Sequence, residues 1–321
     1  MERKETLEKR KKEGAFSFFQ EFFLVRAGKK ERVFFQKDED LKRQLFSLTG
    51  KLNEQEGPGS LSFSEEKISL GIEDFSSVGE LEDRSARFLI PFQKDLKNEG
   101  LSLLSRGVDP WTPFSLPFSS TLEAGEREKR IRVWTGGLYF GLPSGFAEDR
   151  RRRMALAQVL SPIFAAVFDN AGLFEGRPSS CFVLRQELLR KGKSLPTESI
   201  EKEGRIFIAS LDALPLSYGL GAAAFLMGLF QSEENERALE KRLLPENSDN
   251  IRRGKDSARD HGIRGYYLSD YFVNWGMDLL ALAQKGLKKE DQAYLVPLQK
   301  LWSNLDAPRD QTDPPAFDLQ P

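Results

Sequence analysis

A run of aromatic residues near the N-terminus, FSFFQEFFLVR at 16–26, limits the folds open to this chain. Gly14 and Gly28 bound the run, and its length and aromatic content are typical of a buried strand. Further strand-like runs lie at 61–72, 101–108, 130–142 and 206–210. Segments with apolar residues at helical spacing lie at 38–52, 76–98, 149–170, 215–230, 235–244 and 268–286. The pattern predicts strands that alternate with amphipathic helices, and it leaves the order of the strands open.

The chain has 321 residues, with one Cys, one His and a net charge of -1 from 48 Lys and Arg against 49 Asp and Glu. One Cys forms no internal disulfide, and Cys181 with His261 cannot build a zinc site of the Cys and His type. A Ser-His-Asp triad would depend on His261, which we expect at a surface loop or a helix end. The possibilities that remain are catalysis by carboxylates, by Arg and Lys or by hydroxyls, and a protein without catalytic chemistry.

The balance of charges favours neither a general nucleic-acid binder nor a membrane binder. The longest apolar run, at 219–230, has 12 residues, whereas a membrane span needs about 20. Residues 1–14 are charged and lack the apolar core of a secretion signal. We therefore expect a cytoplasmic protein with a charged arm at 1–14, a single domain at 15–305 and a disordered, Pro-rich tail at 306–321.

Four consecutive arginines run from Arg150 to Arg153, at the expected start of the helix at 149–170. They could form a patch for an anion or a nucleic acid, or a solvated first turn. We favour the solvated turn, because Glu148 and Asp149 just ahead partly offset the unfavourable position in the helix dipole. Neither a GxGxxG strand–helix unit nor a GxxxxGK[ST] loop occurs, so the sequence has neither of these phosphate cradles.

Several segments, taken in chain order, resemble the glutamate–cysteine ligase family of ATP-dependent carboxylate–amine ligases. FSFFQEFFLV at 16–25 resembles the family's first strand, G-x-E-x-E-F-F-L, and EGLSLLSRGVDP at 99–110 resembles G-L-x-L-L-G-x-G-x-D-P. TGGLYFGL at 135–142 is similar to the strand T-A-S-V-Q-V-N-L, and the helix and turn that follow are similar to L-x-P-x-x-x-A-L-F-A-N-S-P-F-x-E-G-x-P. SLDALPLSYGL at 210–220 resembles R-x-x-D-A-x-P and the helix after it.

The resemblance implies an α+β fold, a curved and mainly antiparallel sheet backed by helices, related to glutamine synthetase. It also implies a step of glutathione biosynthesis, in which ATP phosphorylates the γ-carboxylate of glutamate and the amine of cysteine displaces phosphate. Such a reaction needs Mg²⁺, which prefers oxygen ligands, and cationic groups around the phosphates. The matched positions that this chain retains are Asp109, Pro110, Thr135, Asn170, Glu175, Gly176, Pro178, Arg185, Asp212 and Pro215.

The positions that would hold the metal and the substrates depart from the family's pattern. Of the paired glutamates in the first strand only Glu21 is kept, and Phe19 replaces the other. Three further glutamates of the pattern fall on Phe63, Ser69 and Phe207, and two arginines fall on Trp134 and Ala209. Its Gln and Asn fall on Tyr139 and Gly141. Apolar rings beside a Mg²⁺ site lower the polarity where the cation needs oxygen. We therefore predict a site that no longer performs the ligase reaction.

Three hypotheses about function follow. The first is a non-catalytic binding or regulatory homologue without a cofactor, whose partner is an active ligase, a second copy of the chain or a glutamate-like small molecule. The second is an active ligase that uses ATP and Mg²⁺ with a rebuilt site, built from Glu21, Glu65 or Glu66 and from Arg132 or Arg185. The third is a structural protein that binds nothing.

Few residues remain as candidates for a site. Arg185 follows CFVL, an expected strand, and takes the place of the family's Arg after the E-G-x-P turn. We expect any anion site to use Arg185, with Arg132 as second choice and Tyr139 nearby, because Arg binds carboxylate or phosphate in bidentate fashion. Glu21 is the remnant of the metal site, and we expect it to share one face of a central strand with Phe19. Converging acidic side chains would favour an enzyme, whereas a face lined by aromatic rings such as Phe19 would favour the other two hypotheses.

Overall fold

The computed structural model describes residues 15–56, 59–64, 66–111, 124–143, 147–174, 177–179, 181–191, 199–202, 205–244 and 246–308. The expected arm at 1–14, most of the expected tail at 306–321, Glu65, Glu175 and Gly176 lie outside these residues. The limits of the expected domain, at 15 and 305, stay a prediction.

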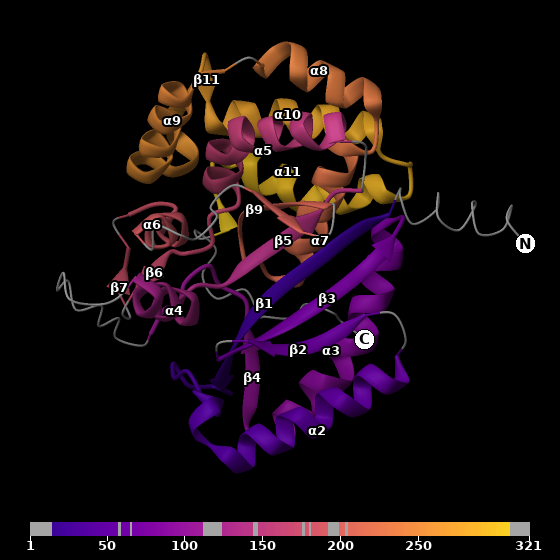
Figure 1. The fold of residues 1–321 in the computed structure, drawn as a ribbon, viewed down its shortest axis with the longest axis vertical. Helices are drawn as coiled ribbons and strands as arrows, with labels where there is room; N and C mark the ends of the chain where they lie inside the picture. The colour runs from indigo at the N-terminus through magenta and orange to yellow at the C-terminus, as the bar shows by residue number, and fades with distance from the viewer. Residues whose placement is uncertain are drawn as a thin grey trace, which may run out of the picture.

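An antiparallel sheet, with seven strands among the described residues, forms the centre of the fold (Figure 1). Its order is β2 (Ser60–Ser64), β3 (Lys67–Phe75), β1 (Phe16–Arg26), β5 (Gly137–Gly141), β9 (Arg205–Asp212) and β8 (Ser199–Lys202), and β4 (Leu101–Leu104) also pairs with β1. Two short hairpins lie outside the sheet: β6 (Leu173–Phe174) with β7 (Arg177–Pro178), and β10 (Tyr266–Tyr267) with β11 (Asp270–Tyr271). The aromatic run at 16–26 is thus the central strand, as expected.

The two faces of this sheet differ, because successive side chains of a strand point to opposite sides. Phe18 and Phe22 of β1 are buried on the side that the helices cover. Phe19 and Glu21 lie together on the other side, as predicted. We name this second side the open face and define it by Phe19, Glu21, Ser69, Gly71, Gly137, Tyr139, Gly141 and Phe207.

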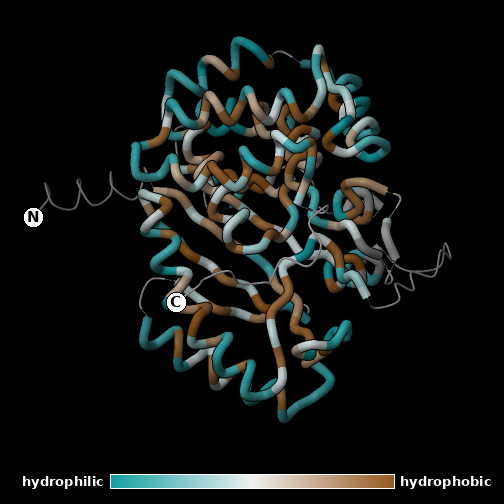
Figure 2. Tube along the Cα trace, turned by 180° about the vertical axis from the view of Figure 1, so that it is seen from behind, coloured by the Kyte–Doolittle hydropathy of each residue, from teal (hydrophilic) through white to brown (hydrophobic). Residues whose placement is uncertain are grey.

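Among the described residues, four helices pack against the sheet: α2 (Glu39–Gln55) on β2, α3 (Val78–Asn98) on β3 and β4, α5 (Ala147–Val167) on β9, and α7 (Leu216–Phe230) on β5. The other helices are α4 (Ala124–Trp134), α6 (Leu184–Lys191), α8 (Glu233–Leu243), α9 (Ser248–His261), α10 (Phe272–Gly286) and α11 (Val296–Ser303), and 3-10 turns lie at Phe35–Lys37, Gly262–Arg264 and Asp291–Leu295. Apolar residues gather on the strands and inner helices, and the outer helices are hydrophilic (Figure 2). The expected mainly antiparallel sheet backed by helices is confirmed.

Local chemistry explains where the helices begin. Asp38 Oδ1 accepts the N–H of Leu41 at 3.0 Å at the start of α2, and Ser77 Oγ accepts the N–H of Glu80 at 3.2 Å at the start of α3. Such caps satisfy N–H groups that have no partner within the helix. The helix expected at 76–98 is therefore confirmed, and it begins at Val78 after its cap Ser77.

The small-residue helix α7 is buried, as expected for its apolar sequence. A Cβ on Gly228 would lie 2.2 Å from the carbonyl oxygen of Ala283, so only glycine lets α7 approach α10 this closely. Of the helices in the described ranges, none is long and apolar enough to cross a membrane.

Two segments expected as strands are partly helical. The first part of the stretch 130–142, up to Trp134, is the last turn of the helix α4. Within this stretch only Gly137–Gly141 forms a strand, β5. The CFVL segment before Arg185 is a turn that leads into α6 at Leu184. Both errors have the same cause: short apolar runs fit a strand or a buried helix equally well, and tertiary contacts decide between them. The helices α9 and α11 were not expected.

Candidate functional site

Two phenylalanines fill the centre of the open face. A Cβ on Gly71 would sit 2.8 Å from the ring of Phe19, and a Cβ on Gly141 would sit 2.7 Å from the ring of Phe207. Each ring therefore occupies the space above a glycine of the neighbouring strand. The two rings meet edge to face, with centroids 5.7 Å apart. Apolar rings thus occupy positions where the family pattern has a Glu on the first strand and another on the strand before Asp212.

Glu21 is held by Lys67, a residue that the sequence patterns do not single out. The Nζ of Lys67 lies 2.6 Å from Oε1 of Glu21, and it donates a second hydrogen bond to the carbonyl oxygen of Thr135 at 2.9 Å. The N–H of Gly137 donates to Oε2 of Glu21 at 2.9 Å. The side chains of Lys67 and Glu21 are 3% and 15% exposed. The carboxylate retained from the family's pair is therefore neutralised inside the protein.

Arg185 lies against the open face at the level of Gly137, whose Cβ position would be 2.3 Å from its Nη2. Its Nη1 donates to the carbonyl oxygens of Ala209 and Leu211, each at 3.0 Å. The residue is 1% exposed, its Nε has no hydrogen-bond partner, and it forms no ion pair with a carboxylate of the described residues. Arg185 is thus a buried cation whose charge is not balanced by an ion pair with any acid of the described residues.

Tyr139 lies near both of these charged groups. Its hydroxyl is 3.4 Å from Nη2 of Arg185, and the Arg185 guanidinium carbon is 5.7 Å from the centre of the ring. Burial is the main cause that raises the pKa of Tyr139 to about 12, and the charge of Glu21 acts in the same direction. The positive charges of Arg185 and Arg132 lower this pKa. The candidate residues Glu21, Tyr139 and Arg185 are therefore brought into one neighbourhood.

The stability of the protein should fall in alkaline solution partly through Tyr139. An unfolded chain ionises tyrosine near pH 10, whereas the folded protein keeps this proton up to about pH 12. The stabilisation from the neutral phenol is therefore present below pH 10 and is lost as the pH rises to about 12. The free energy of unfolding, measured with urea, should fall between about pH 9 and about pH 11.5. In Tyr139→Phe this fall should be smaller by about 1–2 kcal/mol than in the unchanged protein. Identical pH profiles would contradict the burial of this hydroxyl.

The remaining candidates are engaged elsewhere. Arg132 pairs with Glu128 at 2.6 Å along α4, and its side chain is 45% exposed. Glu66 accepts the N–H of Gln36 at 2.9 Å. Phe63, matched to a family glutamate, contacts Phe35 with ring centroids 5.4 Å apart and does not line the open face. Ser69, matched to the second glutamate of the same family strand, lies opposite Glu21.

Several retained family positions form a buried polar network. Asp212 Oδ2 accepts the N–H of Asn170 at 2.8 Å, and Asn170 Oδ1 accepts a hydrogen bond from Arg106 at 2.9 Å. Asp109 pairs with Arg32 at 3.0 Å, with both side chains at most 1% exposed. These polar groups are satisfied within the protein, so their retention is explained by folding.

Some residues of this neighbourhood have no match in the family motifs. Lys67 and Arg32 each pair with a retained acid, Glu21 and Asp109 respectively. For Lys67 a signal was present: it stands two residues before Ser69, so strand alternation places it on the same side as Glu21. Arg32 ends a charged stretch, KKER at 29–32, and nothing in its local pattern indicates a buried pair.

The donor set on the open face does not fit Mg²⁺, which prefers an octahedral shell of oxygen atoms. Glu21 is the carboxylate among the residues that define this face, and the Lys67 ammonium group already lies 2.6 Å from its Oε1. In the described part of the chain, no group of three or more His, Cys, Asp or Glu side chains is placed to hold a metal ion. A dication bound to Glu21 would compete with Lys67 for the same oxygen.

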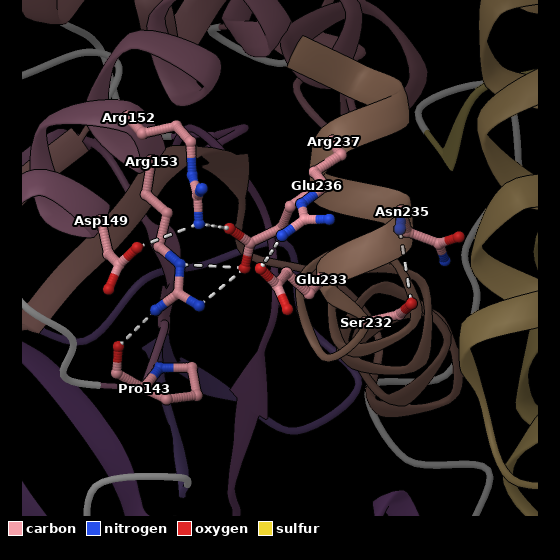
Figure 3. A network of polar contacts seen from close by, with 9 residues as sticks. All are labelled: Pro143, Asp149, Arg152, Arg153, Ser232, Glu233, Asn235, Glu236 and Arg237. Atoms are coloured by element: carbon pink, nitrogen blue, oxygen red, sulfur yellow. Dashed lines mark hydrogen bonds and ion pairs between the residues drawn. The ribbon is translucent and has the colours of Figure 1, made fainter. Parts of the chain in front are cut away.

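Among the arginines from Arg150 to Arg153, Arg152 and Arg153 link the helices α5 and α8. Arg153 Nη2 lies 2.6 Å from Oε1 of Glu236 in α8, and Arg152 Nη2 lies 3.0 Å from Oε2 (Figure 3). The Glu236 side chain is 2% exposed. Arg150 pairs with Glu201 at 3.3 Å. The expected solvated turn is therefore wrong for Arg152 and Arg153, because α8 folds back onto the first turns of α5.

Comparisons with known proteins show which folds this chain resembles. No protein-family model matches the chain, and no curated protein matches its sequence. Among solved structures it is similar to glutamate–cysteine ligase from Francisella tularensis in complex with AMP, with a TM-score of 0.51 and 11% identity over 92% of this chain and 82% of that one. It also matches PafA, the ligase of the ubiquitin-like protein Pup, with a TM-score of 0.48 and 12% identity over 91% and 63% of the two chains. The chain therefore has the fold of glutamate–cysteine ligase, as its motifs predict.

Proposed function

We propose that this chain is a non-catalytic homologue of the carboxylate–amine ligases, which binds a small carboxylate such as glutamate without activating it. The observation that carries the proposal is the charge of the open face. Its carboxylate, Glu21, is neutralised by Lys67 at 2.6 Å, whereas Arg185 is not neutralised by an acid of the described residues. The local balance of charge is positive, which attracts an anion and disfavours a dication.

Loss of catalysis follows from the same residues. Phosphoryl transfer depends on metal ions and cationic groups that stabilise the spreading negative charge. Removing one group that stabilises the transition state typically lowers the rate by about 10² to 10³. Phe19 and Phe207 occupy carboxylate positions of the pattern, and Ala209 occupies its Arg position. Several such losses together should put turnover out of reach.

Arg185 keeps hydrogen-bonding capacity for a ligand. Its Nη1 donates to two carbonyl oxygens, but within the described part of the chain Nε has no partner and Nη2 makes only a contact of 3.4 Å with Tyr139. A carboxylate fits the parallel N–H groups of Nε and Nη2 in bidentate fashion. Because Arg185 is 1% exposed, binding requires the first turn of α6 to move away from the sheet. An active ligase, or a second copy of the chain, is the partner we propose for such a binding module.

The two competing hypotheses, a rebuilt ligase and a protein that binds nothing, require different roles for the polar residues at the open face. A rebuilt ligase needs further polar groups at the open face, but Glu66 binds the N–H of Gln36 and Arg132 pairs with Glu128. A protein that binds nothing would use Arg185 only to hold the carbonyl oxygens of β9.

The test combines an activity assay with a binding assay. With Mg²⁺, ATP, glutamate and cysteine, the purified chain should form no ADP above background. Calorimetric titration should detect glutamate binding that does not depend on Mg²⁺. Arg185→Met should weaken this binding by about 10-fold or more, because a charged hydrogen-bonded pair is lost. Arg242→Met is the matched control, since Arg242 is 47% exposed and pairs with Asp278 in another part of the fold.

Other outcomes would reject the proposal. ADP release that depends on Mg²⁺, is stimulated by an amino acid and is abolished by Glu21→Gln would establish the rebuilt ligase. Absence of glutamate binding in the unchanged chain, or unchanged binding in a folded Arg185→Met variant, would leave Arg185 as a structural group.

A further inference from the structure

The ammonium group of Lys67 occupies a buried position surrounded by acceptors from other parts of the chain. Its Nζ is 2.6 Å from Oε1 of Glu21 in β1 and 2.9 Å from the carbonyl oxygen of Thr135, the residue after α4. The lysine itself comes from the start of β3. We propose that Glu21 and Thr135 form a site for a single positive charge, which the chain fills with its own ammonium group instead of a dissociable ion.

The geometry selects an ammonium-like cation over Mg²⁺. The second carboxylate oxygen of Glu21 accepts the N–H of Gly137 at 2.9 Å, so the carboxylate does not chelate a cation with both oxygens. One charge on Glu21 balances one charge on Lys67, and with side chains 15% and 3% exposed an excess charge would be poorly solvated. Mg²⁺ also requires more oxygen ligands in a near-octahedral shell than Glu21 and Thr135 supply.

This cation site rests on the proposed function in one respect only, because both require that Mg²⁺ does not bind Glu21. Its consequence is measured as stability, whereas the proposed function is measured as glutamate binding and ADP formation. Either can therefore fail while the other stands.

Paired substitutions test whether Lys67 serves as the counter-charge of Glu21. Lys67→Met keeps most of the volume of the side chain and should lower Tm by roughly 5–10 °C, because it leaves Glu21 without its cation. Adding Glu21→Gln to Lys67→Met should restore more than half of that loss. Lys42→Met is the matched control: Lys42 pairs with Glu39 at 3.3 Å, but the two side chains are 31% and 67% exposed. Its Tm should change by less than about 2 °C.

Chemical rescue tests the site directly. Lys67→Ala removes the ammonium group and leaves space for n-propylammonium. Thermal melts with n-propylammonium chloride should show a saturable rise in Tm, whereas 1-propanol, NaCl and MgCl2 at matched concentration or ionic strength should not. The unchanged protein and Lys67→Ala with Glu21→Gln should show no such rise.

Two results would overturn the proposed cation site. Stabilisation of Lys67→Ala by MgCl2 that equals or exceeds the effect of n-propylammonium would overturn the selection of a single charge. A double variant no more stable than Lys67→Met would overturn the cation site itself. If Lys67→Ala does not fold, the comparison of Lys67→Met with and without Glu21→Gln decides.

Discussion

Replacing Glu236 with alanine should lower the free energy of unfolding by about 3–5 kcal/mol. Glu236 is 2% exposed and receives hydrogen bonds from Arg152 and from both Nε and Nη2 of Arg153. Without it, two guanidinium groups that are 24% and 14% exposed lose their common counter-charge. The loss should be measured by urea unfolding, followed by circular dichroism.

The chain contains a matched control on the same helix. Glu233 pairs with Arg237 at 2.5 Å, but both side chains are 69% exposed (Figure 3). Glu233→Ala should therefore cost less than about 1 kcal/mol. Similar losses in the two variants would show that Glu236 contributes no more than a surface ion pair and that α8 is held to α5 by apolar contacts alone.

Restoring the missing family glutamate, by Phe19→Glu, should destabilise the protein by about 2–4 kcal/mol and should not create ligase activity. The Phe19 ring lies over Gly71 and meets Phe207 edge to face at 5.7 Å, and a carboxylate loses both contacts. The new charge would also stand two residues from Glu21 on the same side of β1, where like charges repel. Urea unfolding and an ADP assay with Mg²⁺, ATP, glutamate and cysteine give the two measurements.

Phe46→Glu is the matched control, because it makes the same substitution at an exposed position away from the open face. Phe46 is 50% exposed on α2, so the same change there should cost less than about 1 kcal/mol. A Phe19→Glu variant that is as stable as the unchanged protein and is further stabilised by Mg²⁺ would mean that the open face still accepts a metal. ADP formation by this variant would favour the rebuilt ligase.

Much of the fold follows from local patterns. The aromatic run at 16–26 has the length and bounds of a buried strand, and it is the central strand β1. Period-two alternation places Phe19 and Glu21 on one side, as predicted. Asp38 and Ser77 cap the helices that follow them. These features are predictable because they depend on residues close together in the chain.

The errors arise where a segment is compatible with two structures. RIRVW, at 130–134, is short and apolar enough for a strand, but it ends α4, with Ile131 buried against Val108 and Leu184. The arginines Arg152 and Arg153 follow acidic residues at a helix start, which is typical of a solvated turn. Their partner Glu236 lies more than 80 residues later in the chain, so no local pattern could indicate it.

The sequence alone determined that the chain cannot form a zinc site of the Cys and His type or an internal disulfide, that its motifs resemble the ligase fold, and that only Glu21 of the first glutamate pair is kept. Tertiary structure alone decided the state of that glutamate. Pairing of β1 with β3 brings Lys67 within 2.6 Å of Glu21, and the packing of α6 brings Arg185 to the open face, where no acid of the described residues pairs with it. The physical reason is that the environment of a charge depends on which distant segments bury it, and strand register and helix packing set those contacts.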